Sequence, residues 1–331
     1  MTPVLAPGKL PVELLERLLR HTSRSPLLVV GAGPGEDAAV ATGAQTIVLT
    51  ADPITFTGER IGTYVVAVNA NDIVAMGGRP VYLTTTILLP PGSTEDEVEG
   101  IFAEIEQACR KNDVLWVGGH TEVTSVVTRT IVCGQAVGFL SRAPLSTGGA
   151  RPGDAICMTK WVGLEGTTTI ARERPAVCRE VLGEERARAV RGWLDDPGIS
   201  IVEEGRLLEG CALTSGHDPT EGGIAMGIAE ICRASSVSAV IDPRSLPVRE
   251  ETTLLCRRFG MNPLGLLSSG VFLFTAAPAQ AAEACRRLAA GGIPASAIGR
   301  IEEGSGAWLE TGGTREALVA SAQDEIVKLA E

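Results

Sequence analysis

Aromatic residues, histidines and paired cysteines are all scarce in this chain, and each shortage narrows what the protein can be. Aromatic side chains make up 4% of the 331 residues, so the predicted cores are aliphatic. The eight cysteines are scattered and none forms a CxxC pair. That spacing argues against a zinc site or a disulfide framework and is typical of buried thiols in a reducing cytosol. The composition therefore predicts a cytoplasmic protein.

Long apolar runs and positive charge are lacking as well. No segment is long and apolar enough to span a bilayer, and the first residues are spaced for an amphipathic helix over 9–22 rather than for a signal peptide. The net charge of −11 argues against nucleic acid and anionic membranes as partners. An anionic ligand would need cations to offset the repulsion. The phosphate-binding signature GxxxxGK[ST] is absent, which excludes a P-loop protein.

The most informative feature that is present is Val65–Pro80, VVAVNANDIVAMGGRP, a helix-length run that is apolar almost throughout. Asn69 and Asp72 are three residues apart and share one face of the predicted helix. Asp is rarely buried unless it is paired or bound to a metal. The pattern indicates a hard-cation or polar-ligand site, a helix start, or a satisfied polar contact in the core.

Three further segments place an acidic residue in or just after a turn that follows a predicted strand. They are Gly33–Val40 with Asp37, Thr50–Pro53 with Asp52, and Val117–Val123 with Glu122. Carboxylates at several strand ends can converge on one point, although Asp and Gly are also ordinary turn residues.

The segment His217–Gly223, HDPTEGG, precedes a predicted helix over 220–234. Thr220 is a candidate cap for that helix. The same geometry suits an anion, because a helix N-terminus stabilises negative charge. In the functional interpretation Asp218 faces a cleft between two domains, and His217 acts as an acid or base near neutral pH.

Taken in order, GEDAAV, TADP, AVNANDIVAMGGRP, GGHTEV and HDPTEGG resemble the AIR synthase-like superfamily. That group includes aminoimidazole ribonucleotide synthetase, selenophosphate synthetase, thiamine-monophosphate kinase and the hydrogenase maturation factor HypE, and the HypE pattern is the closest. The resemblance implies an α/β N-terminal domain over 1–145 that forms a barrel across a homodimer. It also implies a C-terminal α+β sandwich over 150–312, followed by a tail over 313–331 that we expect to be helical.

The resemblance further implies ATP and Mg²⁺ as cofactors. The implied metal ligands are Asp37, Asp52, Asp72 and Glu122. Oxygen ligands of this kind suit Mg²⁺, which bridges phosphate oxygens and absorbs developing charge. The implied nucleotide contacts are Gly33, Gly35, Asp37, Asn69, Asp72, Gly118, Gly119 and Thr121, and the implied catalytic residues are His217, Asp218 and His120.

His120 departs from the family pattern, because relatives usually carry Asp or Glu directly after the Gly-Gly of this segment. Imidazole is a poor ligand for Mg²⁺. Three interpretations remain open: Glu122 replaces the missing acid, His120 contacts phosphate, or the nucleotide site is altered. A structural role for His120 is a fourth.

The last residues differ from HypE too. HypE ends in a flexible tail whose terminal cysteine accepts a carbamoyl group, whereas this sequence ends at Ile326–Glu331 without one, and Cys285 lies in a predicted helix. We therefore expect a HypE-like protein that does not carbamoylate itself. The implied function is ATP-dependent activation of a carbonyl-type oxygen or a phosphate acceptor, the acceptor being a small molecule or a protein. The alternatives are a small-molecule kinase like thiamine-monophosphate kinase, or a non-catalytic nucleotide-binding scaffold.

Local patterns predict mixed α and β structure. Val81–Leu89 is a β-branched strand, and Thr94 with Glu97 forms a candidate capping box for the clearest helix. Ser141–Gly153 is rich in Gly, Pro and Ser and indicates a linker. Further strands are expected at 114–117, 128–139, 154–161, 211–215, 237–241 and 270–276, and helices at 164–173, 175–194, 199–210, 250–259 and 278–290.

Overall fold

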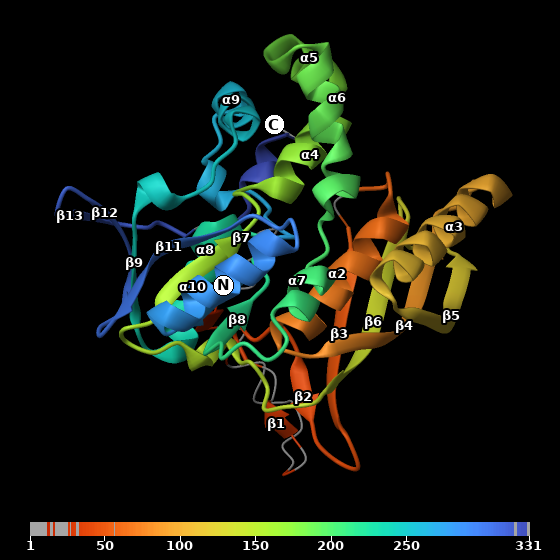
Figure 1. Cartoon of the computed structure of the whole chain (residues 1–331). Coiled ribbons are helices and arrows are strands. Elements are labelled where there is room, and N and C mark those ends of the chain that lie inside the picture. Colours follow the sequence, from red (N-terminus) through yellow and green to blue (C-terminus); the bar gives the residue numbers. More distant parts are fainter. Residues whose placement is uncertain are drawn as a thin grey trace, which may run out of the picture.

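Two β-sheets lie side by side, with one long helix between them (Figure 1). The computed structural model describes residues 12–13, 16, 26, 28–30, 33–55, 57–320 and 323–329. The predicted helix over 9–22 lies largely outside these residues. The predicted two-domain arrangement of mixed α and β structure is observed, whereas the barrel across a dimer remains a prediction.

The N-terminal sheet has six strands in the order β1-β2-β3-β6-β4-β5. All neighbouring strands are antiparallel except β4 and β5, which run parallel. In β6 every second side chain is buried, as expected for a sheet with one face covered. The strands are β1 Leu28–Val30, β2 Ala39–Ala41, β3 Thr46–Ile54, β4 Arg79–Leu89, β5 Leu115–Val123 and β6 Ile131–Leu140.

Two helices cover one face of this sheet. Helix α3, Glu95–Asn112, begins at the predicted capping box: Thr94 accepts from the Glu97 backbone N–H, and the Glu97 carboxylate accepts from Thr94. Helix α2, Ile61–Ala75, matches the apolar run read from the sequence and is buried along nearly its whole length. Its residues contribute to the N-terminal core and also to a core shared with the C-terminal sheet. That position explains why α2 is apolar on every side.

The C-terminal sheet has seven strands in the order β13-β12-β9-β11-β7-β10-β8. Helix α8 packs on it through Ile224, Ile228 and Ile231, and helix α10 packs through Ala281, Ala284 and Leu288. The strands are β7 Ala155–Thr159, β8 Ser215–His217, β9 Ser238–Ile241, β10 Leu273–Ala276, β11 Ala295–Glu302, β12 Gly306–Thr311 and β13 Thr314–Ala317.

A helical group stands above the C-terminal sheet and forms its own small core (Figure 1). Its members are α4 Leu164–Glu173, α5 Pro175–Leu182, α6 Glu184–Gly192 and α9 Glu250–Phe259. Three further helices are α7 Val202–Leu207, α8 Gly223–Ser235 and α10 Pro278–Ala290. The short 3₁₀ turns are η2 Thr147–Gly149, η4 Pro243–Ser245, η5 Pro263–Gly265 and η6 Glu325–Leu329. The turn η3, Leu194–Gly198, is irregular.

Several local predictions were wrong. The tail is not one helix: 314–317 is strand β13, paired with β12, and 325–329 form a 3₁₀ turn. The predicted helix over 175–194 is divided at Gly183, whose φ of 80° a helix does not tolerate. Thr220 does not cap α8, because the cap position is Gly222 and has no side-chain hydrogen bond. Asp52 and Glu122 lie inside β3 and β5 rather than in turns after them.

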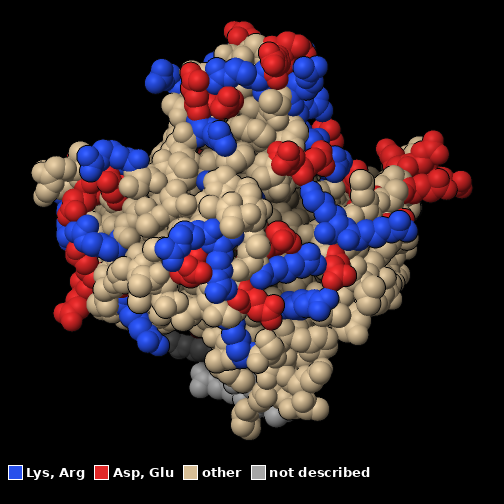
Figure 2. All heavy atoms as spheres, viewed as in Figure 1, with Lys and Arg blue, Asp and Glu red and all other residues tan. Residues whose placement is uncertain are grey.

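Within the described part of the chain, no helix combines the length and the apolar character that crossing a bilayer requires. Positive and negative side chains are interspersed over the face seen in Figure 2. All eight cysteines are free thiols, six of them buried and two partly buried, in agreement with their predicted role as small core residues.

Candidate functional site

Three of the predicted acids come together beside α2. Asp37 lies in the loop before β2, Asp52 on β3 and Asp72 on α2, and we call these three side chains the carboxylate cluster. The hydroxyl of Thr50 lies among them: its Oγ1 is 2.5 Å from Asp72 Oδ2 and 3.2 Å from Asp52 Oδ2. The same oxygen is 3.5 Å from the backbone carbonyl of Asp37. The convergence predicted from separate segments is therefore observed for these three acids.

The cluster is electrostatically costly as it stands. Burial raises the pKa of Asp72 well above its usual range, and the neighbouring charges of Asp52 and Asp37 raise it further. Only 7% of Asp72 is exposed. Carboxylates that share a site disfavour one another's ionisation, and a bound cation removes that cost.

The two asparagines of α2 position the backbone around the cluster. Asn69 is completely buried, and its amide exchanges hydrogen bonds with the backbone N–H and carbonyl of Asp52. Asn69 thus fixes β3 at Asp52 and is not free for the nucleotide contact that we predicted. Asn71 fixes a backbone segment of the other domain: its amide donates to the carbonyl of Ile199 and accepts from the N–H of Ile201.

His217, at the end of β8, lies between two carboxylates. Its Nδ1 is 2.8 Å from Asp37 Oδ2 and its Nε2 is 2.9 Å from Glu230 Oε2 on α8. Burial alone would lower the pKa of His217, but the charges and hydrogen bonds of Asp37 and Glu230 outweigh it and raise that pKa to about 10. Both ring nitrogens therefore donate, and the side chain is an imidazolium. This corrects the prediction of an acid or base near neutral pH.

Asp218 follows directly and has no such partner. Its side chain is 2% exposed, and neither carboxylate oxygen has a hydrogen bond of ordinary geometry with the described residues, although the Asn71 side chain lies close enough to lower its pKa in part. Burial raises the pKa of Asp218 well above its usual range, and Asp37 adds to the increase. An unsatisfied buried carboxylate is costly, so Asp218 has the features of a group awaiting a ligand.

The loop before β2 reaches this position because of one glycine. Gly35 has a φ of 82°, and a Cβ there would lie 3.2 Å from the Glu230 side chain. A larger residue would be strained and crowded, so Gly35 lets the loop approach α8. Gly33, its predicted companion, has neither constraint. At the N-terminus of α8 an acid of this chain is already bound, since Asp324 Oδ2 accepts from the Gly222 N–H at 2.7 Å.

The predicted residues of the Gly-Gly segment lie elsewhere. Gly118, Gly119, His120, Thr121 and Glu122 all belong to β5, the edge strand, which β6 and β4 separate from β3. With strands about 4.8 Å apart, that places them roughly 14 Å from β3. His120 and Glu122 are exposed and contact one another at 3.3 Å. Within one protomer, therefore, they do not join the carboxylate cluster.

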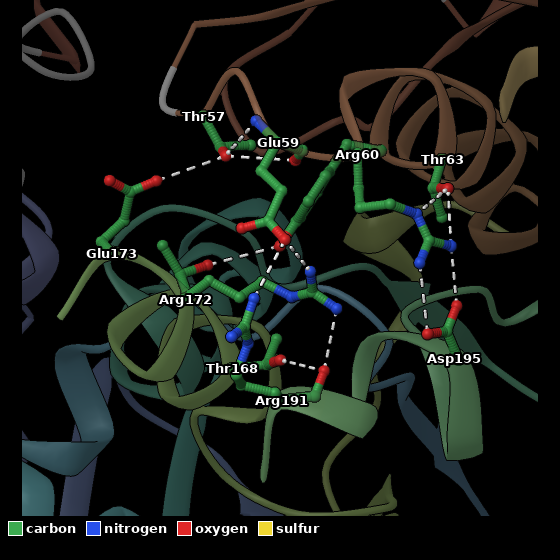
Figure 3. Close-up of polar contacts among 11 residues, drawn as sticks. Thr57, Glu59, Arg60, Thr63, Thr168, Arg172, Glu173, Arg191 and Asp195 are labelled. Carbon is green, nitrogen blue, oxygen red and sulfur yellow. Dashed lines mark hydrogen bonds and ion pairs between the residues drawn. The ribbon is translucent and has the colours of Figure 1, made fainter. Parts of the chain in front are cut away.

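Ion pairs join the segment before α2 to the helical group of the other domain (Figure 3). The Glu59 carboxylate accepts from Arg172 at 2.9 Å and from Arg191 at 3.2 Å. Next to it, Arg60 donates to Asp195 at 2.7 Å, and the hydroxyl of Thr57 lies 3.5 Å from Glu173. These contacts link the two domains near the start of α2.

Several cavities among the described residues have walls from both domains, and two of them bear on the site. The larger, of about 660 Å³, has Arg60, Lys111 and Lys160 in its wall and contains none of the predicted site residues. The other, of about 250 Å³, is lined by Asp52 on one side and by Glu165 of α4 on the other. The smaller cavity is the one that adjoins the carboxylate cluster.

No set of three or more His, Cys, Asp or Glu side chains among the described residues is already gathered closely enough to hold a metal ion. The donor set is nevertheless all oxygen, which suits Mg²⁺, and Mg²⁺ usually takes only one or two carboxylates together with phosphate oxygens and water. The unpartnered oxygens of Asp218 and the raised pKa of Asp72 fit a cation that arrives with a ligand.

Sequence reasoning missed four residues of this region: Thr50, Asn71, Glu230 and Glu165. Thr50 is the first residue of TADP, two residues before Asp52, and Asn71 directly precedes Asp72, so their places in the motifs were a usable signal. Glu230 and Glu165 lie in helices without a motif, and only the fold brings them to the site.

Comparisons with known proteins agree with the fold. Residues 35–140 match the AIR synthase related protein N-terminal domain, and residues 151–309 match the corresponding C-terminal domain. The chain is 29% identical to the carbamoyl dehydratase HypE of Azotobacter vinelandii over 284 residues, 84% of this chain and 79% of that protein. It is 30% identical to thiamine-monophosphate kinase of Pyrococcus abyssi over 265 residues, 78% of this chain and 77% of that protein.

Among solved structures, the hydrogenase maturation protein HypE in complex with ATP superposes with a TM-score of 0.74 at 23% identity. The match covers 95% of this chain and 96% of that one. At this identity the likeness establishes the fold, and the resemblance predicted from the motifs is confirmed by the family matches.

Proposed function

Because the chain belongs to the AIR synthase related family and is HypE-like, we propose that it is an ATP- and Mg²⁺-dependent enzyme. The proposed reaction transfers a phosphoryl group to a carbonyl-type oxygen or a phosphate acceptor, which turns that oxygen into a leaving group. The observation that carries the proposal is the convergence of three acids from separate segments: the carboxylates of Asp52 and Asp72 meet at Thr50, and Asp37 lies close enough for its charge to raise the pKa of Asp72. The ATP complex of HypE and the two named relatives support it.

Mg²⁺ would be held by the carboxylate cluster, with Asp218 as a further oxygen donor facing the same space. When bound, the ion would offset the charge of a nucleotide triphosphate in a protein of net charge −11 and stabilise charge that develops during transfer. The role of His217 follows from its contacts: as an imidazolium it holds Asp37 in place and offsets part of the local negative charge. It is a positioning residue rather than a general base.

Turnover tests this proposal and separates it from its alternatives. ATP is supplied with Mg²⁺ and either a carboxamide or a phosphate monoester, and ADP and inorganic phosphate are both measured. Activation of a carbonyl oxygen releases inorganic phosphate with ADP, whereas a small-molecule kinase gives ADP and a phosphorylated product without it. Asp218→Asn should lose turnover in either case. ADP formation that is absent with every acceptor, while ATP still binds, would favour the scaffold.

We also propose that the protein is a homodimer joined through β5. This edge strand exposes Leu115, Val117 and Val123 by 60%, 57% and 61%. An unpaired apolar edge favours association with another chain. The predicted nucleotide contacts at Gly118, Gly119 and Thr121 and the predicted roles of His120 and Glu122 then require a second protomer, since one protomer keeps them away from the cluster.

A further inference from the structure

The cavity of about 250 Å³ beside the carboxylate cluster has walls from both domains. Asp52 and Tyr64 form the N-terminal wall, and Glu165, Thr169 and Ser269 form the C-terminal wall. Asp52 belongs to the cluster and to this cavity at once. A molecule that fills the cavity therefore has one end at the cluster and the other in the space between the domains.

Glu165 is a buried acid with an unused oxygen. The residue is 7% exposed, and its Oε2 has no hydrogen-bond partner among the described residues. Ser269 is its hydrogen-bonding neighbour, and burial nevertheless raises the pKa of Glu165 to about 7. Leaving a buried acceptor unpaired costs about 1–3 kcal/mol, and more for a charged one. A ligand that donates a hydrogen bond to this oxygen would remove that cost.

The charges around the cavity limit what such a ligand can be. No Lys, Arg or His occurs among the described residues that line it, whereas Asp52, Glu165 and Glu221 all contribute carboxylates. An anionic group here would meet the repulsion of these carboxylates, and no cationic side chain of the cavity wall would offset it. The hydroxyls of Thr169 and Ser269 and the apolar side chains of Ile54 and Leu267 suit a small molecule that is uncharged or positively charged.

We propose that this cavity is the acceptor pocket and that the free oxygen of Glu165 binds an N–H group of the acceptor. The acceptor is then a small amide-like molecule without negative charge, which presents its carbonyl oxygen toward Asp52 and an N–H group toward Glu165. That the bound molecule is the acceptor of the reaction rests on the proposed function, whereas the selectivity for N–H donors rests only on the cavity. Glu165 makes or breaks no bond in this account; it binds and orients.

Hydrogen bonds link the two walls of the cavity, and Figure 3 shows one of them, between Thr57 and Glu173. Thr57, which lines the cavity, lies 3.5 Å from Glu173 of α4, the helix that also carries Glu165 and Thr169. A second contact joins the two walls, where Tyr64 Oη and Thr169 Oγ1 are 3.4 Å apart. Glu165 is thus presented to the cavity by a wall that is fixed against the segment leading into α2, as a binding residue must be.

Calorimetry with small probes tests the proposal without knowledge of the natural acceptor. Benzamidine, benzamide and benzoate have one ring and differ in the group that would face Glu165. We expect the full-length protein to bind benzamidine, benzamide or both, and not benzoate at the same concentrations. Glu165→Gln should weaken benzamidine binding at least tenfold, which corresponds to about 1.4 kcal/mol. The matched control Glu99→Gln, at an exposed position on α3, should bind like the wild type.

Three results would overturn the proposal: benzoate binding as tightly as benzamidine, no binding of either N–H probe, or unchanged benzamidine affinity in Glu165→Gln. If that variant does not fold, a benzamidine-soaked crystal of the wild type decides instead, since its amidinium must lie at Glu165 and not elsewhere. ATP affinity is measured on the same samples. If the wild type binds the probes but does not bind ATP, the proposed function is refuted and the proposed selectivity of the cavity for N–H donors is retained.

Discussion

The imidazole Nδ1 of His217 lies 2.8 Å from the carboxylate of Asp37, and this contact joins the C-terminal sheet to the loop before β2 of the N-terminal sheet. Glu230 holds the opposite ring nitrogen at 2.9 Å. The candidate site is therefore assembled across the domain boundary, and one buried positive charge holds two negative charges in place.

Replacing His217 by Gln should destabilise the protein. The change leaves Asp37 and Glu230 close together without their shared cation, and removal of one partner from a buried ion pair costs about 3–5 kcal/mol. Urea unfolding at neutral pH measures the loss. His120→Gln is the control, because His120 is exposed and its replacement should change the free energy of unfolding by no more than about 0.5 kcal/mol. Equal stability of the two variants would show that the His217 contacts contribute nothing.

Glu165→Gln should stabilise the protein, and only at higher pH. The pKa of Glu165 is about 7 in the folded state against 4.5 ordinarily, so below pH 4.5 the carboxyl is protonated in both states and costs nothing. As the pH rises toward 7 the unfolded chain loses the proton first, and the wild type loses stability that Gln retains. The gain should approach about 3 kcal/mol above pH 7. Chemical unfolding of both proteins at pH 4 and pH 8 measures it; a gain that is the same at both would contradict the assigned shift.

A positive charge on β5 should dissociate the proposed dimer. Val117→Lys places an ammonium group on the exposed edge strand, where pairing with a second copy would bury it. Light scattering at micromolar concentration should give a dimer mass for the wild type and a monomer mass for this variant. Val248→Lys, at a residue that is 37% exposed outside the N-terminal sheet, should remain dimeric. A monomeric wild type would refute the dimer.

The sequence predicted correctly those elements that are determined by a few neighbouring residues. The capping box at Thr94 and Glu97 sets the start of α3 by reciprocal hydrogen bonds between neighbours. The apolar run around Asp72 predicted a buried helix with an acid in a special environment, which is what α2 provides. In that run the interpretation of a satisfied polar contact also holds, since Asn69 and Asn71 are fully hydrogen-bonded in the interior.

The rest depended on contacts between distant segments. Whether His217 is neutral or charged is decided by Asp37, 180 residues away in sequence, and no local pattern reports that distance. The sequence of the tail predicted a helix and not a strand, because strand β13 is formed by hydrogen bonds to β12, and a local pattern does not report that pairing. Glu165 lies in a short helix whose sequence looks ordinary, and its unused oxygen is a property of the assembled cavity.

The central claim is that a cation links the carboxylate cluster to a nucleotide, and calorimetry of ATP binding tests it most directly. ATP is titrated into the wild type with Mg²⁺ and with EDTA, and into Asp72→Asn, Asp37→Asn and the exposed control Glu99→Gln with Mg²⁺. The account predicts that ATP binds to the wild type and to Glu99→Gln only when Mg²⁺ is present, and that both Asp variants lose binding. Equal affinity in EDTA, or unchanged affinity in both Asp variants, would contradict it.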